Sequence, residues 1–161
     1  MSAHRIAVQP LALREKEILQ RIAQGKTTVE AASDMDLSAG SVKAHLVLIG
    51  GRLGVLSRPA MVHLAYGYGQ MDVPKPLKRV VVLTEPQQKV LEGIADDRTV
   101  EEIAGQEQRP LADVRKDARL MVRALGASSP PHAVTRAWQF GLLGNVPALA
   151  DPPVIAAETA Q

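Results

Sequence analysis

The sequence has no cysteine and few aromatic side chains, since only four of its 161 residues are Phe, Tyr or Trp. The absence of cysteine excludes disulfide bonds, thiolate nucleophiles and cysteine-ligated zinc or iron–sulfur sites. Large β-sandwiches and barrels rely on aromatic and β-branched strands. A chain that is 46% hydrophobic but poor in aromatics therefore favours helices packed through Leu, Ile, Val and Ala. Its length suits one ordinary domain or two very small ones.

Long apolar runs are also missing. The longest, such as residues 46–49 and 80–83, are far shorter than the roughly 20 residues needed to cross a bilayer. Residues 1–10 lack the basic-then-apolar pattern of a secretory signal. We therefore expect a cytoplasmic protein with no membrane partner. The formal charge of +2 is too small to indicate a nucleic-acid partner by itself, so that inference depends on where the charges lie.

The chain contains an internal repeat with a period of 72 residues. Residues 8–69 align without a gap with residues 80–141, and 17 of the 62 aligned positions are identical. A chance match between two Leu- and Ala-rich stretches would not align residues that mark caps and turns. Such residues are aligned at Thr27/Thr99, Gly54/Gly126, Ser57/Ser129 and Pro59/Pro131. The sequence therefore indicates a tandem duplication.

The apolar periods and capping residues of each copy predict four short helices. The helices of the first copy are expected to begin near Leu11, Thr27, Ser38 and Ser57, and their counterparts near Leu83, Thr99, Leu111 and Ser129. The third helices are expected to end at Gly54 and Gly126, and the fourth helices at about Gly67 and about Leu143. Two short helices joined by a tight turn, the second entered through a cap, form a helix-turn-helix. The expected fold class is all-α.

The predicted boundaries are a first domain at residues 8–69, a linker with two prolines at 70–79, a second domain at 80–143 and a disordered tail at 144–161. The run at 79–83, Arg-Val-Val-Val-Leu, is interpreted as apolar anchorage leading into the second copy, because five residues without a partner strand make a poor strand. A copy of about 60 residues is marginal alone, so contact between the copies would help stability.

A series of short motifs occurs in order between residues 11 and 65: Arg14-Glu15, Ile18-Leu19, Leu37-Ser38, Val42-Lys43, His45 and Arg52-Leu53-Gly54-Val55. This stretch resembles the LuxR-type, GerE-like helix-turn-helix domain, and the second copy resembles the same domain more faintly. Two departures stand out. The family's usual Thr-Pro at the start of the first helix is Ala12-Leu13 here, and Gly50-Gly51 lie inside the third helix, where each glycine costs up to about 1 kcal/mol relative to alanine.

The resemblance implies two tandem four-helix LuxR-like helix-turn-helix domains. It also implies a sequence-specific, double-stranded DNA-binding transcriptional regulator from a bacterium or one of its mobile elements. In such a domain the third helix lies in the major groove. Residues 38–58 carry three basic side chains and no acidic one. The candidates in the first copy are Ser41, Val42, Lys43 and His45 at base edges, and Lys26, Ser38, Arg52 and Arg58 at the DNA backbone.

The second copy differs at the corresponding positions, because Asp113 replaces Ser41 and Asp117 replaces His45. Carboxylates facing phosphates are repelled unless they are paired. The first copy is therefore expected to be the principal reader, and the second a weaker contact through Arg115, Lys116 and Arg119. In the alternative, the protein is an interaction adaptor that binds RNA polymerase or another regulator through the divergent second domain.

The resemblance also implies that the fourth helix of each copy is the dimerisation element, with Val62, Ala65, Tyr66 and Trp138 as candidates. Two arrangements stay open. One chain could form an intramolecular pseudo-dimer, with one copy on each half-site, or two chains could pair as a homodimer through the first copy. His63 is expected to face outward from this helix.

An enzyme is not expected. The four histidines, His4, His45, His63 and His132, are scattered without HxxxH or HExxH spacing, and no Gly-rich phosphate loop follows a strand. The sequence thus predicts no catalytic residue, no metal site and no cofactor.

Overall fold

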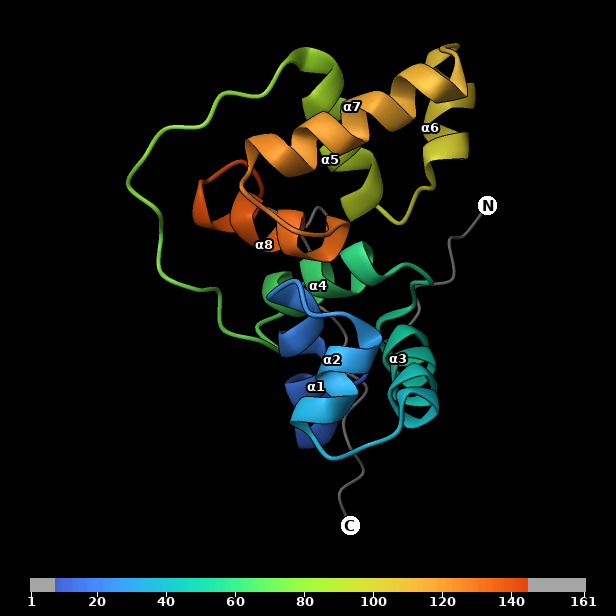
Figure 1. Cartoon of the computed structure of the whole chain (residues 1–161), viewed down its shortest axis with the longest axis vertical. Helices are drawn as coiled ribbons and strands as arrows, with labels where there is room; N and C mark the ends of the chain where they lie inside the picture. The colour runs from blue at the N-terminus through green and yellow to red at the C-terminus, as the bar shows by residue number, and fades with distance from the viewer. Residues whose placement is uncertain (1–7, 145–161) are drawn as a thin grey trace.

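The computed structural model describes residues 8–144, which form eight α-helices and no β-strand (Figure 1). The helices are α1 (Leu13–Ala23), α2 (Thr28–Asp34), α3 (Ala39–Leu53), α4 (Arg58–Gly67), α5 (Glu85–Ala95), α6 (Val100–Glu107), α7 (Leu111–Ala124) and α8 (Pro130–Gln139). The all-α prediction is confirmed. Of the tail predicted at 144–161, residues 145–161 lie outside the described residues.

The two halves of the chain, residues 8–69 and 80–143, follow the same local backbone path. Helices α1 to α4 begin at residues 13, 28, 39 and 58, and α5 to α8 begin at 85, 100, 111 and 130, a constant offset of 72. Left-handed backbone is unfavourable for residues other than glycine, so its positions mark where a turn demands it. Those positions recur at the same offset, as Gly25/Asp97, Asp36/Gln108, Gly54/Gly126 and Gly69/Gly141.

The predicted caps are present. The Thr27 hydroxyl accepts a hydrogen bond from the Glu30 backbone N–H, and the Glu30 carboxylate accepts one from the Thr27 N–H, which completes a capping box at the start of α2. Ser38, Ser57 and Ser129 cap α3, α4 and α8 through their hydroxyls.

The predicted end of the last helix is wrong, because α8 stops at Gln139 rather than near Leu143. Gly141 adopts a φ of 73°, and the Leu142 N–H turns back to donate to the Ala137 carbonyl at 2.8 Å. This is the glycine-terminated pattern that commonly closes helices.

The core of each half is built from equivalent helix faces. In the first half Ile18, Leu19, Val42 and Ile49 are fully buried, and in the second half Val90, Leu91, Val114 and Met121 take the corresponding places. Among the described residues no single helix is long and apolar enough to cross a bilayer, and only α3 and α4 together, bent by 52°, pass such a test. Both helices contribute to the buried core of the first half.

The segment between the halves runs as a long loop along one side of the molecule (Figure 1). It is held to the end of α8, since the Leu77 N–H donates to the Gln139 carbonyl and the Gln139 side-chain amide donates to the Lys75 carbonyl, both at 3.0 Å. The interpretation of residues 79–83 as apolar anchorage is correct for alternate residues only. Val81 and Leu83 pack against the core, whereas Val80 and Val82 are 87% and 84% exposed.

Helices α4 and α8 pack against each other and join the two halves (Figure 1). The Tyr66 hydroxyl lies 3.0 Å from the Thr135 hydroxyl, and the Trp138 indole N–H donates to His63 Nδ1 at 3.0 Å. At the offset of 72, Tyr66 corresponds to Trp138 and His63 to Thr135. The second contact is therefore the first with the halves exchanged.

A second pair of contacts shows the same exchange. The Asp97 carboxylate, in the turn after α5, accepts from the Leu56 and Ser57 backbone N–H groups at 3.1 and 2.8 Å. The Ser128 hydroxyl donates to the Gly25 carbonyl, in the turn after α1, at 3.3 Å. Gly25 corresponds to Asp97 and Leu56 to Ser128. Contacts that exchange in this way define an approximately twofold interface, here within one chain.

The candidate dimerisation residues are covered by this interface. Val62 and Ala65 are fully buried, Tyr66 is 8% exposed and Trp138 is half-buried. In this structure α8 of the same chain covers this face of α4, and pairing of two chains stays a prediction. The outward orientation expected of His63 is wrong, since its side chain is buried against Trp138. Burial lowers the pKa of the His63 imidazole, and the charge of Asp96 opposes that shift.

Candidate nucleic-acid interface

The N-terminal turn of α3 has the features expected of a groove-binding helix. The Ser38 hydroxyl accepts from the Ser41 N–H at 3.0 Å, and no acidic residue lies in the first turn. No carboxylate in the first turn therefore compensates the positive end of the helix dipole. Lys43 is exposed, one turn into the helix, and forms no ion pair or hydrogen bond within residues 8–144.

Val42, predicted to contact a thymine methyl group, is fully buried, so that prediction is wrong. The buried face of α3 consists of Val42, Leu46, Ile49 and Leu53, which are spaced by three and four residues. Val42 belongs to this face and packs in the core. Ser41 and His45 are half-buried beside it, and His45 Nδ1 is a buried atom without a hydrogen-bond partner.

The exposed face of α3 is mostly apolar and nearly uncharged. We define the outer face of α3 by its exposed residues, which are Gly40, Lys43, Ala44, Val47, Leu48 and Gly51. Val47 is 75% exposed and Leu48 is 54% exposed. Lys43 is the one charged residue on this face. Sequence reasoning missed Val47 and Leu48, although the spacing of the buried positions could have placed them outside.

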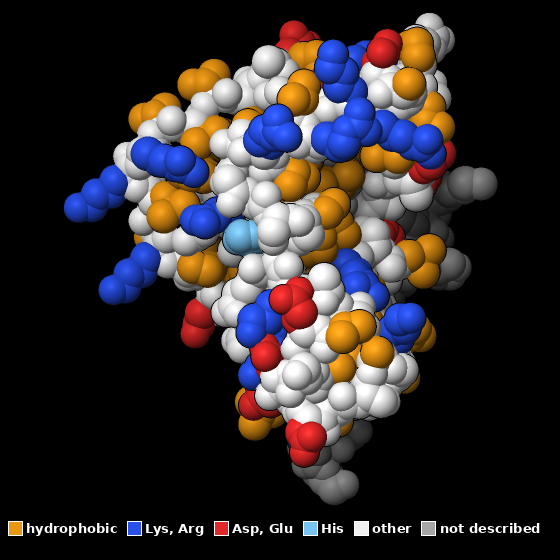
Figure 2. Space-filling model, in the orientation of Figure 1, with side chains coloured by type: hydrophobic (Ala, Val, Ile, Leu, Met, Phe, Trp, Pro, Cys, Tyr) orange, Lys and Arg blue, Asp and Glu red, His pale blue; other side chains and the backbone are white. Residues whose placement is uncertain are grey.

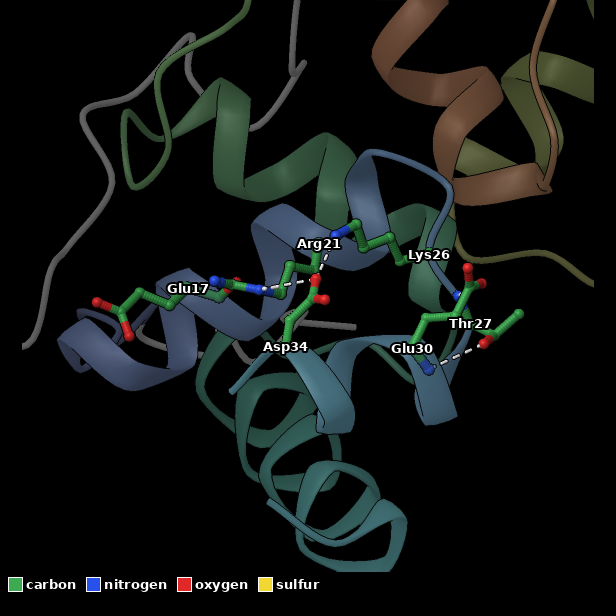
Figure 3. A network of polar contacts seen from close by, with 6 residues as sticks. All are labelled: Glu17, Arg21, Lys26, Thr27, Glu30 and Asp34. Atoms are coloured by element: carbon green, nitrogen blue, oxygen red, sulfur yellow. Dashed lines mark hydrogen bonds and ion pairs between the residues drawn. The ribbon is translucent and has the colours of Figure 1, made fainter. Parts of the chain in front are cut away.

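Lys26, a predicted backbone contact, is engaged within the chain. Its ammonium group pairs with the Asp34 carboxylate, which also lies 3.5 Å from Arg21 Nε (Figure 3). The Lys26 hydrogen bond holds the pKa of Asp34 below its usual value. Figure 3 shows this cluster between α1 and α2, where one carboxylate is shared by two cations.

Arg52 and Arg58 are engaged as well. Arg52 Nε lies 3.0 Å from the Glu15 carboxylate, which is itself buried, so this pair ties the end of α3 to α1. Arg58 Nη1 donates to the Thr28 hydroxyl at 2.9 Å. Of the four basic candidates in the first half, Lys43 alone has no hydrogen bond or ion pair to its head group from residues 8–144.

The second half concentrates its basic residues on α7 (Figure 2). Lys116, Arg119 and Arg123 are exposed and form no ion pair within the described ranges, whereas Arg115 lies 3.3 Å from Glu101. Asp117, expected to repel phosphates, is neutralised by Arg109 at 2.6 Å. Arg123, which sequence reasoning did not place among the candidates, extends this surface.

A shallow apolar hollow of about 520 Å³ lies past the C-terminal end of α3, and its rim includes Val47, Gly51 and Leu56. Leu56 is 92% exposed. Within residues 8–144 no group of three or more His, Asp or Glu side chains is arranged to hold a metal ion.

Residues 9–65 match the protein family described as bacterial regulatory proteins, luxR family. The match covers α1 to α4 up to Ala65, which is less than half of the chain, and it does not extend to the second half. A domain of this family indicates a regulatory protein that binds DNA. No curated protein and no solved structure matches the chain.

Proposed function

We propose that the protein is a sequence-specific, double-stranded DNA-binding transcription regulator built from two tandem LuxR-like domains. The observation that carries this proposal is the family match over residues 9–65, together with the serine-capped, acid-free start of α3. Residues 8–69 are the main reader and residues 80–143 are a divergent second copy. As a DNA-binding regulator of transcription, the protein would act in the cytoplasm and need no cofactor.

The recurring offset of 72 residues supports an origin by duplication. The exchanged contacts between α4 and α8 support one chain acting as an intramolecular pseudo-dimer. In a dimer of helix-turn-helix domains, the two reading helices meet half-sites about one helical turn of DNA apart. The single chain would thus present α3 to one half-site and α7 to the other.

The two helices would divide the work of binding. Lys43 and Ser41 lie where α3 would meet base edges, and the capped N-terminus of α3 suits a phosphate. Lys116 and Arg119 on α7 carry uncommitted positive charge, which suits phosphate contacts that position the protein without reading sequence.

Fluorescence anisotropy against duplexes selected from a random library, at low and at physiological salt, tests this function. Lys43→Ala should weaken binding to the selected duplex. Lys89→Ala, which removes the same charge from α5, should leave it nearly unchanged. The proposed function would be contradicted if the protein bound no duplex at physiological salt, or if Lys43→Ala and Lys89→Ala had equal effects.

The adaptor alternative has one observation in its favour, the mixed charge of α7, where exposed Asp113 lies beside Arg115 and Lys116. An adaptor would capture purified bacterial RNA polymerase through the second half with no DNA present. A charge-reversing Lys116→Glu substitution would then abolish the capture of RNA polymerase. A regulator that acts by binding DNA should not capture the polymerase in the absence of DNA.

A further inference from the structure

The outer face of α3 offers little to a partner that is recognised by hydrogen bonds. Beyond Lys43, its side chains are the methyl group of Ala44 and the branched aliphatic groups of Val47 and Leu48. These three residues follow the helical spacing that places them on one side. An exposed stripe of this kind is unfavourable in water unless a partner covers it.

Two adjacent glycines, at positions 50 and 51, lie in the C-terminal half of α3, and only the first is explained by packing among the described residues. A Cβ atom on Gly50 would lie 2.6 Å from the Val55 carbonyl oxygen, so the turn into α4 requires a glycine there. A Cβ atom on Gly51 would meet no atom of residues 8–144 within 4 Å. Glycine inside a helix is unfavourable relative to alanine, and the packing of the described residues does not explain its presence at position 51. A surface that comes within van der Waals distance of the helix would explain it.

We propose that α3 recognises the 5-methyl groups of thymine in the major groove through Val47 and Leu48. This inference rests on the proposed function. Thymine is the base that presents an apolar group in the major groove, and apolar side chains are the groups that contact it. Lys43, next to this stripe, supplies a single polar contact to guanine or phosphate.

The same reasoning predicts an asymmetric target. At the offset of 72, Ala44, Val47 and Gly51 correspond to Lys116, Arg119 and Arg123, so the second half presents cations where the first presents small or apolar residues. The half-site under α3 is expected to require thymine at specific positions. The half-site under α7 is expected to tolerate most sequences, because phosphate contacts carry no base information.

The test replaces thymine by deoxyuridine, which pairs identically but lacks the methyl group. A duplex selected from a random library is prepared with deoxyuridine at each thymine in turn, and its affinity for the full chain is measured. Each contacted methyl group should contribute about a fourfold loss of affinity when removed, the effect of one buried methyl-sized group. The losses should cluster in one half of the site.

Protein variants connect the effect to α3. Val47→Ala and Leu48→Ala should weaken binding to the thymine duplex and should remove the further loss caused by deoxyuridine. Val29→Ala on α2 is the matched control, because Val29 is 68% exposed against 75% for Val47. It should change neither affinity nor the response to deoxyuridine.

Tight binding that is indifferent to deoxyuridine would overturn this inference while leaving the proposed function intact. A response to deoxyuridine that persists in both Val47→Ala and Leu48→Ala would also overturn it. Failure to bind any duplex would overturn the proposed function, and the stripe would then belong, with the hollow beside Leu56, to a protein-binding surface.

Discussion

Helices α3 and α7 occupy equivalent positions in the two halves, but their exposed faces differ in charge. Their inner faces are alike, since Val42 and Val114 are both fully buried and begin equivalent core stripes. Their outer faces differ in charge at three of the six positions. Lys43 corresponds to Arg115, Ala44 to Lys116, Val47 to Arg119 and Gly51 to Arg123. The large apolar residue Leu48 keeps its counterpart, Leu120, which is 37% exposed against 54%.

This comparison separates the residues that maintain the fold of each half from the residues that are exposed for contact with a partner. Residues that cap helices, end them or fill the core recur in both halves, because the same backbone path requires them. Outer residues are free of that requirement, so they can differ where the two halves meet different surroundings. The divergence from small and apolar to cationic is therefore the best guide to how the two halves differ in function.

The largest expected effect comes from breaking the interface between α4 and α8, which fixes α3 and α7 relative to each other. Trp138→Ala removes an aromatic side chain that contacts Tyr66 and donates to buried His63. We expect the free energy of unfolding to fall by about 3 kcal/mol, as for other large-to-small changes at packed sites. Urea denaturation measures this. Trp138→Phe keeps most of the packing and should cost clearly less, and equal losses would show that the hydrogen bond to His63, rather than packing, carries the contribution.

Exchange of the outer residues of α7 for those of α3 should remove the electrostatic share of DNA binding. The triple change Lys116→Ala, Arg119→Val and Arg123→Gly deletes three uncommitted cations. The slope of log affinity against log salt should become shallower by about three, because each phosphate contact contributes roughly 0.9 to that slope. Titrations at four salt concentrations measure it. An unchanged slope would mean that α7 does not face phosphates.

The adjacent glycines of α3 should respond oppositely to alanine. Gly51→Ala meets no neighbouring atom among residues 8–144 and should stabilise the fold by up to about 1 kcal/mol. Gly50→Ala should destabilise it, because its methyl group would meet backbone of the turn into α4. Thermal unfolding compares the two. A loss of stability in both variants would show that Gly51 is required by the fold itself, which would remove the support it gives to a close partner.

Mild acid should weaken the contact between the halves by a smaller amount. Burial lowers the pKa of His63, and burial with the nearby Arg136 charge lowers that of His132. Both imidazoles therefore favour the neutral form when folded, so their contribution to stability is complete above the unfolded pKa of about 6.5 and is lost as pH falls below it. Unfolding midpoints should fall between about pH 7.5 and about pH 5.5. The double change His63→Gln and His132→Gln should flatten this dependence, and a wild-type midpoint that rises over the same interval would contradict it.

Local features of the fold could be predicted from the sequence because they depend on neighbours along the chain. The capping box at Thr27, the serine cap at Ser38 and the glycine end at Gly54 each follow from a few adjacent residues. The repeat of 72 residues could be predicted as well, because it depends only on identical residues at aligned positions of the sequence.

The candidate site was harder to predict because it depends on contacts between distant residues. Arg52 is paired with Glu15, 37 positions away, and no local pattern shows that pairing. Val42 was placed on the wrong side of its helix because residue type, rather than the buried spacing of Leu46 and Ile49, assigned its face. The place of Tyr66 against Thr135 required both halves to be folded and docked.

The central claim is that the outer face of α3 enters the groove of a duplex, and tethered cleavage tests it most directly. The chain has no cysteine, so Ala44→Cys creates a single site for an iron–EDTA reagent. With a selected duplex bound, we expect strand cleavage confined to one half of the binding site. The same reagent on Gln20→Cys, at an exposed position of α1, should cleave weakly or not at all. A bound duplex that is left intact by the reagent at position 44 would contradict the account.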